Sequence, residues 1–91
     1  MSYITKLVDR ATSTKNKKPL KVGNYSATTQ DGGNCYVTHF YHKDEYFATL
    51  TVDRPSTLGV TLGIYKRVSC GAELMKAIKD IYPNMVDHKE F

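Results

Sequence analysis

Apolar and polar side chains alternate through much of residues 20–68, and three polar segments interrupt the alternation. A period of two is that of a β-strand, whose successive side chains point to opposite faces. The interruptions at 30–34, 42–45 and 54–57 are rich in Gly, Asn, Asp and Pro, which favour turns or break strands. Short turns place neighbouring strands antiparallel. The pattern therefore predicts strands over 22–29, 35–41, 46–53 and 60–68, with Gly23 marking a bulge in the first.

Segments with the period of a helix flank these strands. Apolar residues between Tyr3 and Ala11 recur at spacings of three and four, which predicts a short helix over 3–12. Ser69 is a suitable N-cap for a second helix that continues through Tyr82, and Pro83 ends it. The predicted fold class is α+β: a four-stranded antiparallel β-meander with the C-terminal helix packed on one face and a short N-terminal helix.

The size and composition of the chain indicate one globular domain over residues 1–91. Hydrophobic residues make up 41% and charged residues 24%, which argues against wholesale disorder. No apolar run approaches the roughly 20 residues that span a bilayer, and the N-terminus lacks the pattern of a signal peptide. We therefore expect a cytoplasmic protein, of the producing or host cell, with no membrane partner. The tail at 84–91 has too little pattern to predict an element.

The positive charge is concentrated near the N-terminus. Residues 1–21 hold six Lys or Arg and one Asp, whereas residues 22–91 hold seven basic and eight acidic residues. A basic loop is expected at 13–21, since this stretch lacks apolar periodicity. A basic segment on a near-neutral domain attracts polyanions or an acidic protein. Alternatively, the basic residues form only a solvated loop that keeps the protein soluble, since such a loop has the same composition.

Alternation along the predicted strands assigns their side chains to two faces. The aliphatic face, expected under the C-terminal helix, takes Val37, Ala48, Leu50, Val52, Val60, Leu62 and Ile64. The other face mixes rings, hydroxyl groups and one arginine, and takes Tyr25, Tyr36, Thr38, Phe40, Phe47, Thr49, Thr51, Thr61, Tyr65 and Arg67. A solvated face normally carries more Lys and Glu, and a buried face more Leu and Val. The mixed composition is typical of a recognition surface.

The mixed face has three interpretations, between which the sequence does not choose. In the first, the N-terminal helix covers it and completes a three-layer core. In the second, the face or an edge strand pairs two copies as a homodimer. In the third, nucleic acid binds, with bases stacked on the rings and phosphates held by the basic segment. The third interpretation predicts a binding site at Lys15, Lys17, Lys18, Lys21, Tyr25, Tyr36, Phe40, Phe47, Tyr65 and Arg67.

The nucleic acid expected at such a site is single-stranded, bound with little sequence preference. The aromatic-glycine signature of an RNA-recognition motif is absent, as are zinc-finger spacing and a helix rich in Arg and Asn. The alternative function is that of a small phage- or virus-type protein that binds and inhibits a host protein. That association comes from the length of the chain and its lack of motifs. The exposed rings would then be the main anchors of a protein interface.

Candidate reactive groups are few. Cys35, His39 and His42 are close in sequence, but a structural zinc site needs four ligands. Cys70 begins the last helix, and because a helix N-terminus lowers the pKa of a thiol, it is the best candidate for a reactive group. No base is placed beside it. Nothing implies an oxidising compartment, so both cysteines are expected as free thiols. We predict no catalytic residue, metal or cofactor, and a binding protein rather than an enzyme.

Overall fold

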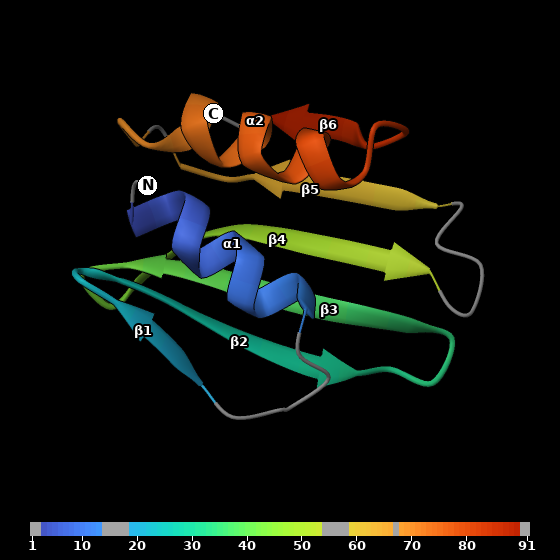
Figure 1. Cartoon of the computed structure of the whole chain (residues 1–91), viewed down its shortest axis with the longest axis horizontal. Helices are drawn as coiled ribbons and strands as arrows, with labels where there is room; N and C mark the ends of the chain where they lie inside the picture. The colour runs from blue at the N-terminus through green and yellow to red at the C-terminus, as the bar shows by residue number, and fades with distance from the viewer. Residues whose placement is uncertain (1–2, 14–18, 54–58, 67, 90–91) are drawn as a thin grey trace.

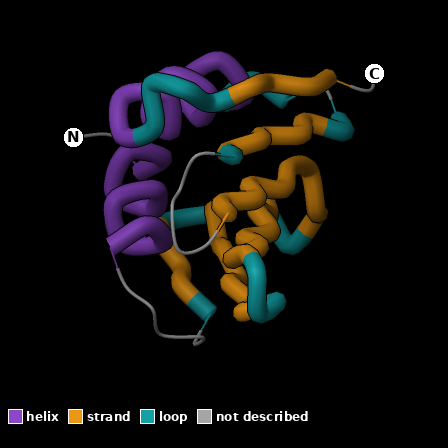
Figure 2. The backbone as a smooth tube through the Cα atoms, turned by 90° about the vertical axis from the view of Figure 1, so that its right-hand side faces the viewer, coloured by secondary structure: helices purple, strands orange, loops and turns teal. Residues whose placement is uncertain are grey.

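The protein is a two-layer α+β structure in which a six-stranded sheet carries two helices on one face (Figures 1 and 2). The computed structural model describes residues 3–13, 19–53, 59–66 and 68–89. Its elements are α1 (Tyr3–Ser13), β1 (Leu20–Val22), β2 (Tyr25–Asp31), β3 (Cys35–His42), β4 (Glu45–Asp53), β5 (Val60–Ile64), α2 (Gly71–Ile81) and β6 (Val86–Lys89). The strands lie in the sheet in the order of the chain.

The predicted meander is present as β2 to β5, and the sheet has one further strand at each edge. The strand predicted over 22–29 is divided by a turn at Gly23 and Asn24, so β1 and β2 form a hairpin. Gly23 has φ +61°, which suits the first position of a two-residue hairpin turn rather than the predicted bulge. Lys21, expected in a basic loop, lies in β1. The lysines at 15, 17 and 18 lie outside the described residues.

The last strand makes the sheet mixed rather than antiparallel. β6 pairs with β5 in parallel, because α2 crosses the sheet between the two strands and returns the chain to the same end. Residues Val86 to Lys89 therefore form a strand where no element was expected. The helix before it begins one residue later than predicted: its N-cap is Cys70, without a side-chain capping hydrogen bond, and Ser69 is outside it.

One hydrophobic core lies between the helices and the sheet. Both helices supply fully buried side chains to it, among them Ile4, Leu7 and Val8 from α1 and Leu74 and Ile78 from α2. Fully burying a large aliphatic side chain contributes about 1.5–3 kcal/mol before entropy is subtracted. The three-layer interpretation is wrong, because α1 lies beside α2 on the same face of the sheet (Figure 2).

The face assigned to β3 is also wrong. Phe40 pairs with Ala48, and Thr38 pairs with Leu50, so these β3 side chains face the helices together with the aliphatic side chains of β4. Phe40 is 0% exposed. The hydroxyl of the buried Thr38 is satisfied by a 3.0 Å hydrogen bond with Thr29 Oγ1, which lets a polar residue occupy the core.

A β-bulge in β4 explains the burial of Phe47. Tyr41 pairs with Tyr46, whereas the preceding residue Phe40 pairs with Ala48, so Phe47 is an extra residue on β4. Phe47 is 1% exposed and Ala48 is also buried, which breaks the strict alternation that assigned Phe47 to the mixed face. The carbonyl of Phe47 accepts a 2.8 Å hydrogen bond from the Tyr65 backbone N–H. The bulge thus ties the end of β5 to β4.

Candidate binding face

The sheet face turned away from the helices is the candidate functional surface. Paired residues on adjacent strands share a face, so the register defines rows across the sheet. Three rows of four residues lie on this face: Lys21, Ser26, Tyr41 and Tyr46; then Thr28, His39, Thr49 and Gly63; then Gln30, Val37, Thr51 and Thr61. We call these residues, together with Tyr65, the open face. None of them is Asp or Glu, although the pair Cys35 and Asp53 lies on the same side beyond the third row, and no described element packs over them.

Three tyrosines gather at one end of the open face and form what we call the tyrosine cluster. The ring of Tyr46 lies at its centre, 6.0 Å between centroids from Tyr41 and 5.7 Å from Tyr65. Tyr46 is 37% exposed and Tyr65 is 36% exposed, and Tyr41 is half-buried. Planes tilted by 59° and 31° keep the rings from stacking on one another. Each ring therefore retains surface that a flat partner can contact.

Hydrogen bonds hold the central ring in place. His39 Nδ1 lies 3.1 Å from Thr49 Oγ1, and the Tyr46 hydroxyl also hydrogen-bonds this oxygen. The His39 ring contacts the Tyr46 ring edge-on, with centroids 5.5 Å apart. One threonine hydroxyl has a single proton to donate and two lone pairs to accept with, so it can serve both partners. The Tyr46 ring is thus oriented before any ligand arrives.

Gly63 makes room for the third ring. A Cβ atom added to Gly63 would lie 2.5 Å from the hydroxyl oxygen of Tyr65 and 2.8 Å from its Cζ. The Tyr65 ring therefore folds back over Gly63, on the side of the sheet that Tyr46 occupies. A glycine inside a strand often marks such a close approach.

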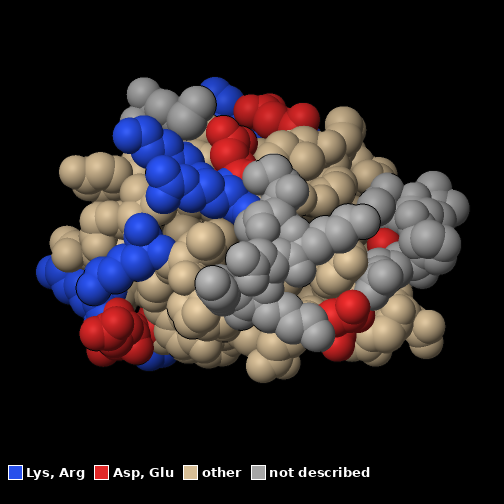
Figure 3. Space-filling view, turned by 60° about the horizontal axis from the view of Figure 1, so that its bottom comes forward, with Lys and Arg blue, Asp and Glu red and all other residues tan. Residues whose placement is uncertain are grey.

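One lysine shares the first row with the tyrosine cluster. Lys21 is exposed in this row, Lys43 follows β3 in an exposed turn, and Lys66 directly follows Tyr65. Lys66 Nζ lies 3.9 Å from a carboxylate oxygen of Glu45, which pairs with the helix-side His42, so Lys66 extends away from the open face. Both side chains are mostly in solvent, so this ion pair is weak. Figure 3 shows Lys and Arg gathered near the end of the molecule where the β1–β2 and β3–β4 turns lie, with Asp and Glu among them.

The predicted site residues fall into different parts of the fold. Tyr65 and Lys21 lie on the open face. Tyr25 and Tyr36 lie on the helix side, both half-buried, with Tyr36 opposite Val52. Phe40 and Phe47 are core residues, so their prediction as exposed rings is wrong. Residues 15, 17, 18 and 67 lie outside the described residues.

Among the ring-bearing residues of the open face, sequence reasoning missed His39, Tyr41 and Tyr46. A signal for the tyrosines was present in the chain. If Lys43 and Asp44 are the two central residues of a hairpin turn, His42 pairs with Glu45 and Tyr41 pairs with Tyr46, as the structure has them. Turn length thus places both rings on one face, whereas alternation counted separately along each strand does not.

Cys70 is not set up as a nucleophile. It is buried where α2 begins, near the Tyr25 hydroxyl. Burial raises the pKa of the Cys70 thiol above its ordinary value, opposite to the lowering expected from a helix N-terminus. Cys35 is half-buried, and both cysteines are free. His42 stacks on Tyr25 on the helix side, away from Cys35 and His39.

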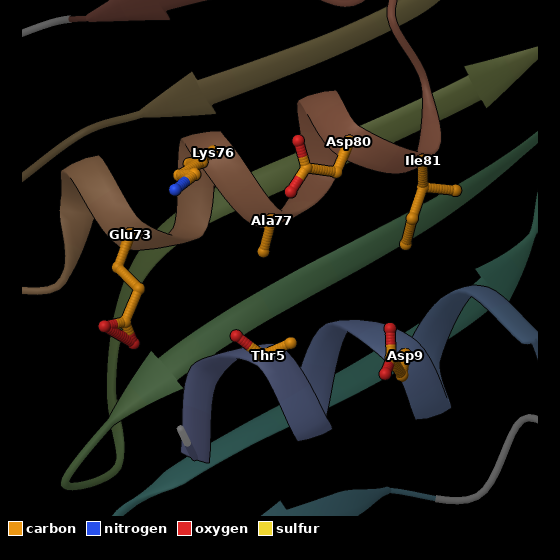
Figure 4. A pocket seen from close by; sticks show the side chains of 7 residues that line it. All are labelled: Thr5, Asp9, Glu73, Lys76, Ala77, Asp80 and Ile81. Atoms are coloured by element: carbon orange, nitrogen blue, oxygen red, sulfur yellow. The ribbon is translucent and has the colours of Figure 1, made fainter. Parts of the chain in front are cut away.

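A groove of about 430 Å³ lies between the two helices, on the opposite side of the sheet from the open face (Figure 4). It is lined by Thr5, Asp9, Glu73, Lys76, Ala77, Asp80 and Ile81. Its carboxylates come from both helices, and they give this groove a chemistry unlike that of the open face. Across the described ranges, no three His, Cys, Asp or Glu side chains come together in a way that could hold a metal ion.

Comparisons with known proteins found no match: neither a family model, nor a curated protein, nor a solved structure resembles this chain. Neither helix in the described part of the chain has the length and apolar character needed to cross a membrane.

Proposed function

We propose that this protein is a small non-enzymatic binding protein that holds single-stranded nucleic acid on its open face, with little sequence preference. The observation that supports this most is the tyrosine cluster, whose rings are part-exposed and share the open face with Lys21. Stacking of a base on an aromatic ring contributes about 1–3 kcal/mol and tolerates any base. Lysine contacts to phosphates add a term that weakens as salt is raised.

The charge of the open face favours a polyanion over a second copy of the chain. Face-to-face pairing of two copies would bring lysines such as Lys21 onto a surface whose three rows hold no carboxylate. Like charges without partners oppose such pairing. A nucleic-acid strand brings the negative charges that the rows lack.

Replacement of the central ring tests the proposal. The chain has seven tyrosines and no tryptophan, so its intrinsic fluorescence comes from tyrosine. A base stacked on a tyrosine ring is expected to quench this fluorescence. Tyr46→Ala is expected to weaken binding of a fluorescein-labelled 15-nucleotide oligo-dT about five- to 150-fold, the equivalent of one lost stacking contact. Tyr3→Ala is the matched control, since Tyr3 is 58% exposed on α1, on the other side of the sheet. Equal affinities for both variants would refute the proposal.

A second candidate is a phage- or virus-type protein that binds and inhibits a host protein. It is favoured by apolar side chains on this side of the sheet, since Val37 is half-buried in the third row and Val86, which pairs with Thr61, is highly exposed. Tyrosines with apolar neighbours are common anchors of protein interfaces. This candidate predicts a purified complex with one host protein that survives nuclease and is lost in Val86→Glu. Loss of the partner on nuclease treatment would favour the first function.

A further inference from the structure

We infer that the bound strand crosses the β-strands along the first row, from Lys21 past Tyr41 and Tyr46 to Tyr65, and that about four nucleotides fill the site. This inference rests on the proposed function and adds the path, the footprint and the selection against duplex. The row is set by register: Lys21, Ser26, Tyr41 and Tyr46 lie opposite one another on four adjacent strands.

The length of the path follows from the spacing of strands. Adjacent strands lie about 4.8 Å apart, so the first row spans roughly 14 Å from β1 to β4. Tyr65, which follows β5, extends the path by about one more strand spacing, to roughly 19 Å. Three rings occupy one half of this path, and Lys21 is at its other end. We expect one base on each ring and a phosphate at Lys21.

The separation of the rings selects an unstacked strand. Neighbouring ring centroids in the cluster are 5.7 and 6.0 Å apart, whereas bases in a duplex rise by about 3.4 Å. Bases on neighbouring tyrosines are therefore pulled well apart, as an extended single strand allows. A duplex keeps its bases stacked and buried inside, so it cannot use this row.

The distribution of charge favours a path across the strands over one along them. The second row holds Thr28, His39, Thr49 and Gly63, and the third holds Gln30, Val37, Thr51 and Thr61, so neither holds a lysine. A nucleic-acid strand lying along β3 or β4 would contact only one ring of the first row before leaving this row. A nucleic-acid strand crossing them meets Lys21 at one end and the Tyr65 ring at the other.

A length series of oligo-dT tests the footprint. Affinity, measured by quenching of tyrosine fluorescence, is expected to rise steeply from two to about four nucleotides. Beyond about four nucleotides, affinity is expected to rise only in proportion to the number of equivalent binding positions on the longer oligonucleotide. A hairpin duplex, whose strands stay paired, is expected to bind at least tenfold more weakly than a single strand of the same number of nucleotides. Growth of affinity that stays steep to eight or more nucleotides, or equal binding of duplex, contradicts the inferred path but leaves single-strand binding intact. Absence of binding at every length contradicts the proposed function itself.

Salt dependence tests the lysine end of the path. For single strands, log K falls with log salt by about 0.7 for each phosphate contact. Lys21→Ala is expected to reduce this slope by about 0.7, while Lys79→Ala, exposed on α2, leaves it unchanged. If Lys21→Ala keeps the full slope while the protein still binds oligo-dT, the path does not end at Lys21.

Discussion

At the scale of single residues, the position of Tyr65 depends on its neighbour Gly63. The Tyr65 ring occupies the space that any other side chain at 63 would need. The ring therefore reaches Tyr46 only because residue 63 lacks a Cβ. A residue that contacts no ligand thus determines whether the cluster has two rings or three.

Gly63→Ala is therefore expected to displace Tyr65 and to weaken oligo-dT binding about fivefold or more, as loss of one stacking contact would. Thermal unfolding, followed by circular dichroism, checks that the variant is folded. The Tyr65→Ala background is the control: there, Gly63→Ala has no ring left to displace and is expected to change affinity little. A full additional loss in that background would show that Gly63 acts by another route.

At the scale of elements, the β3–β4 hairpin determines which rings share a face. Its two-residue turn has Lys43 at φ 51° and Asp44 at φ 66°, a pair of left-handed residues that matches the right-handed twist of the strands. Neither residue is glycine or asparagine, the usual occupants of such positions. The hairpin therefore forms despite unfavourable turn residues, because Tyr41 and Tyr46 contact each other and Phe47 enters the core.

Asp44→Gly is expected to stabilise the protein by about 0.5–1 kcal/mol, because glycine adopts positive φ without the steric penalty of a side chain. Urea denaturation measures the change through the midpoint at constant slope. Asp44→Ala removes the same carboxylate without relieving the backbone, so it is expected to give no such gain. A loss of stability in Asp44→Gly would mean that the Asp44 side chain contributes more than its backbone strain costs.

Elements with a strong local pattern were predictable from the sequence. The apolar stripe of α1 and the strands at 35–41 and 46–53 were found near their observed bounds, and short turns gave the antiparallel order of β2 to β5. The strand predicted over 60–68 ends at Ile64, and the one predicted over 22–29 is divided by a turn. β6 was not predictable, because Val86 to Lys89 carry no strand pattern and form a strand only by pairing with β5. The bulge at Phe47 was not predictable for a similar reason. One extra residue in β4 moves the residues before it to the opposite face of the sheet, and the extra residue can be recognised only from the pairing with β3.

The sequence predicted the type of surface that forms the candidate site, but not which residues form it. An aromatic and hydroxyl-bearing sheet face exists, and Tyr65 is on it. Phe40 and Thr38 were assigned to it because alternation within β3 does not say which of its two faces meets the helices. Val37 looked like the better core residue by hydrophobicity. The fold instead buries the larger Phe40 and satisfies Thr38 through Thr29.

At the scale of the whole molecule, both helices pack on one face of the sheet, and this arrangement leaves the other face available as a binding surface. An antiparallel sheet can keep one face on the core and the other in water. The water-exposed side chains here are mainly Thr, Tyr and His, which suit a strand and also offer rings and hydroxyl groups. The helix side instead presents a groove with three carboxylates, which would repel a polyanion. Under the proposed function, a nucleic acid is therefore expected on the open face rather than on the helices.

Amide chemical shifts of the ¹⁵N-labelled protein, titrated with a four-nucleotide oligo-dT, test the central claim most directly. The account predicts that the largest shifts cluster at Tyr41, Tyr46 and Tyr65 and along the first row to Lys21, while α1 and α2 change little. Shifts concentrated on the helices, or no shifts at millimolar oligonucleotide, would contradict the claim that the open face binds single-stranded nucleic acid.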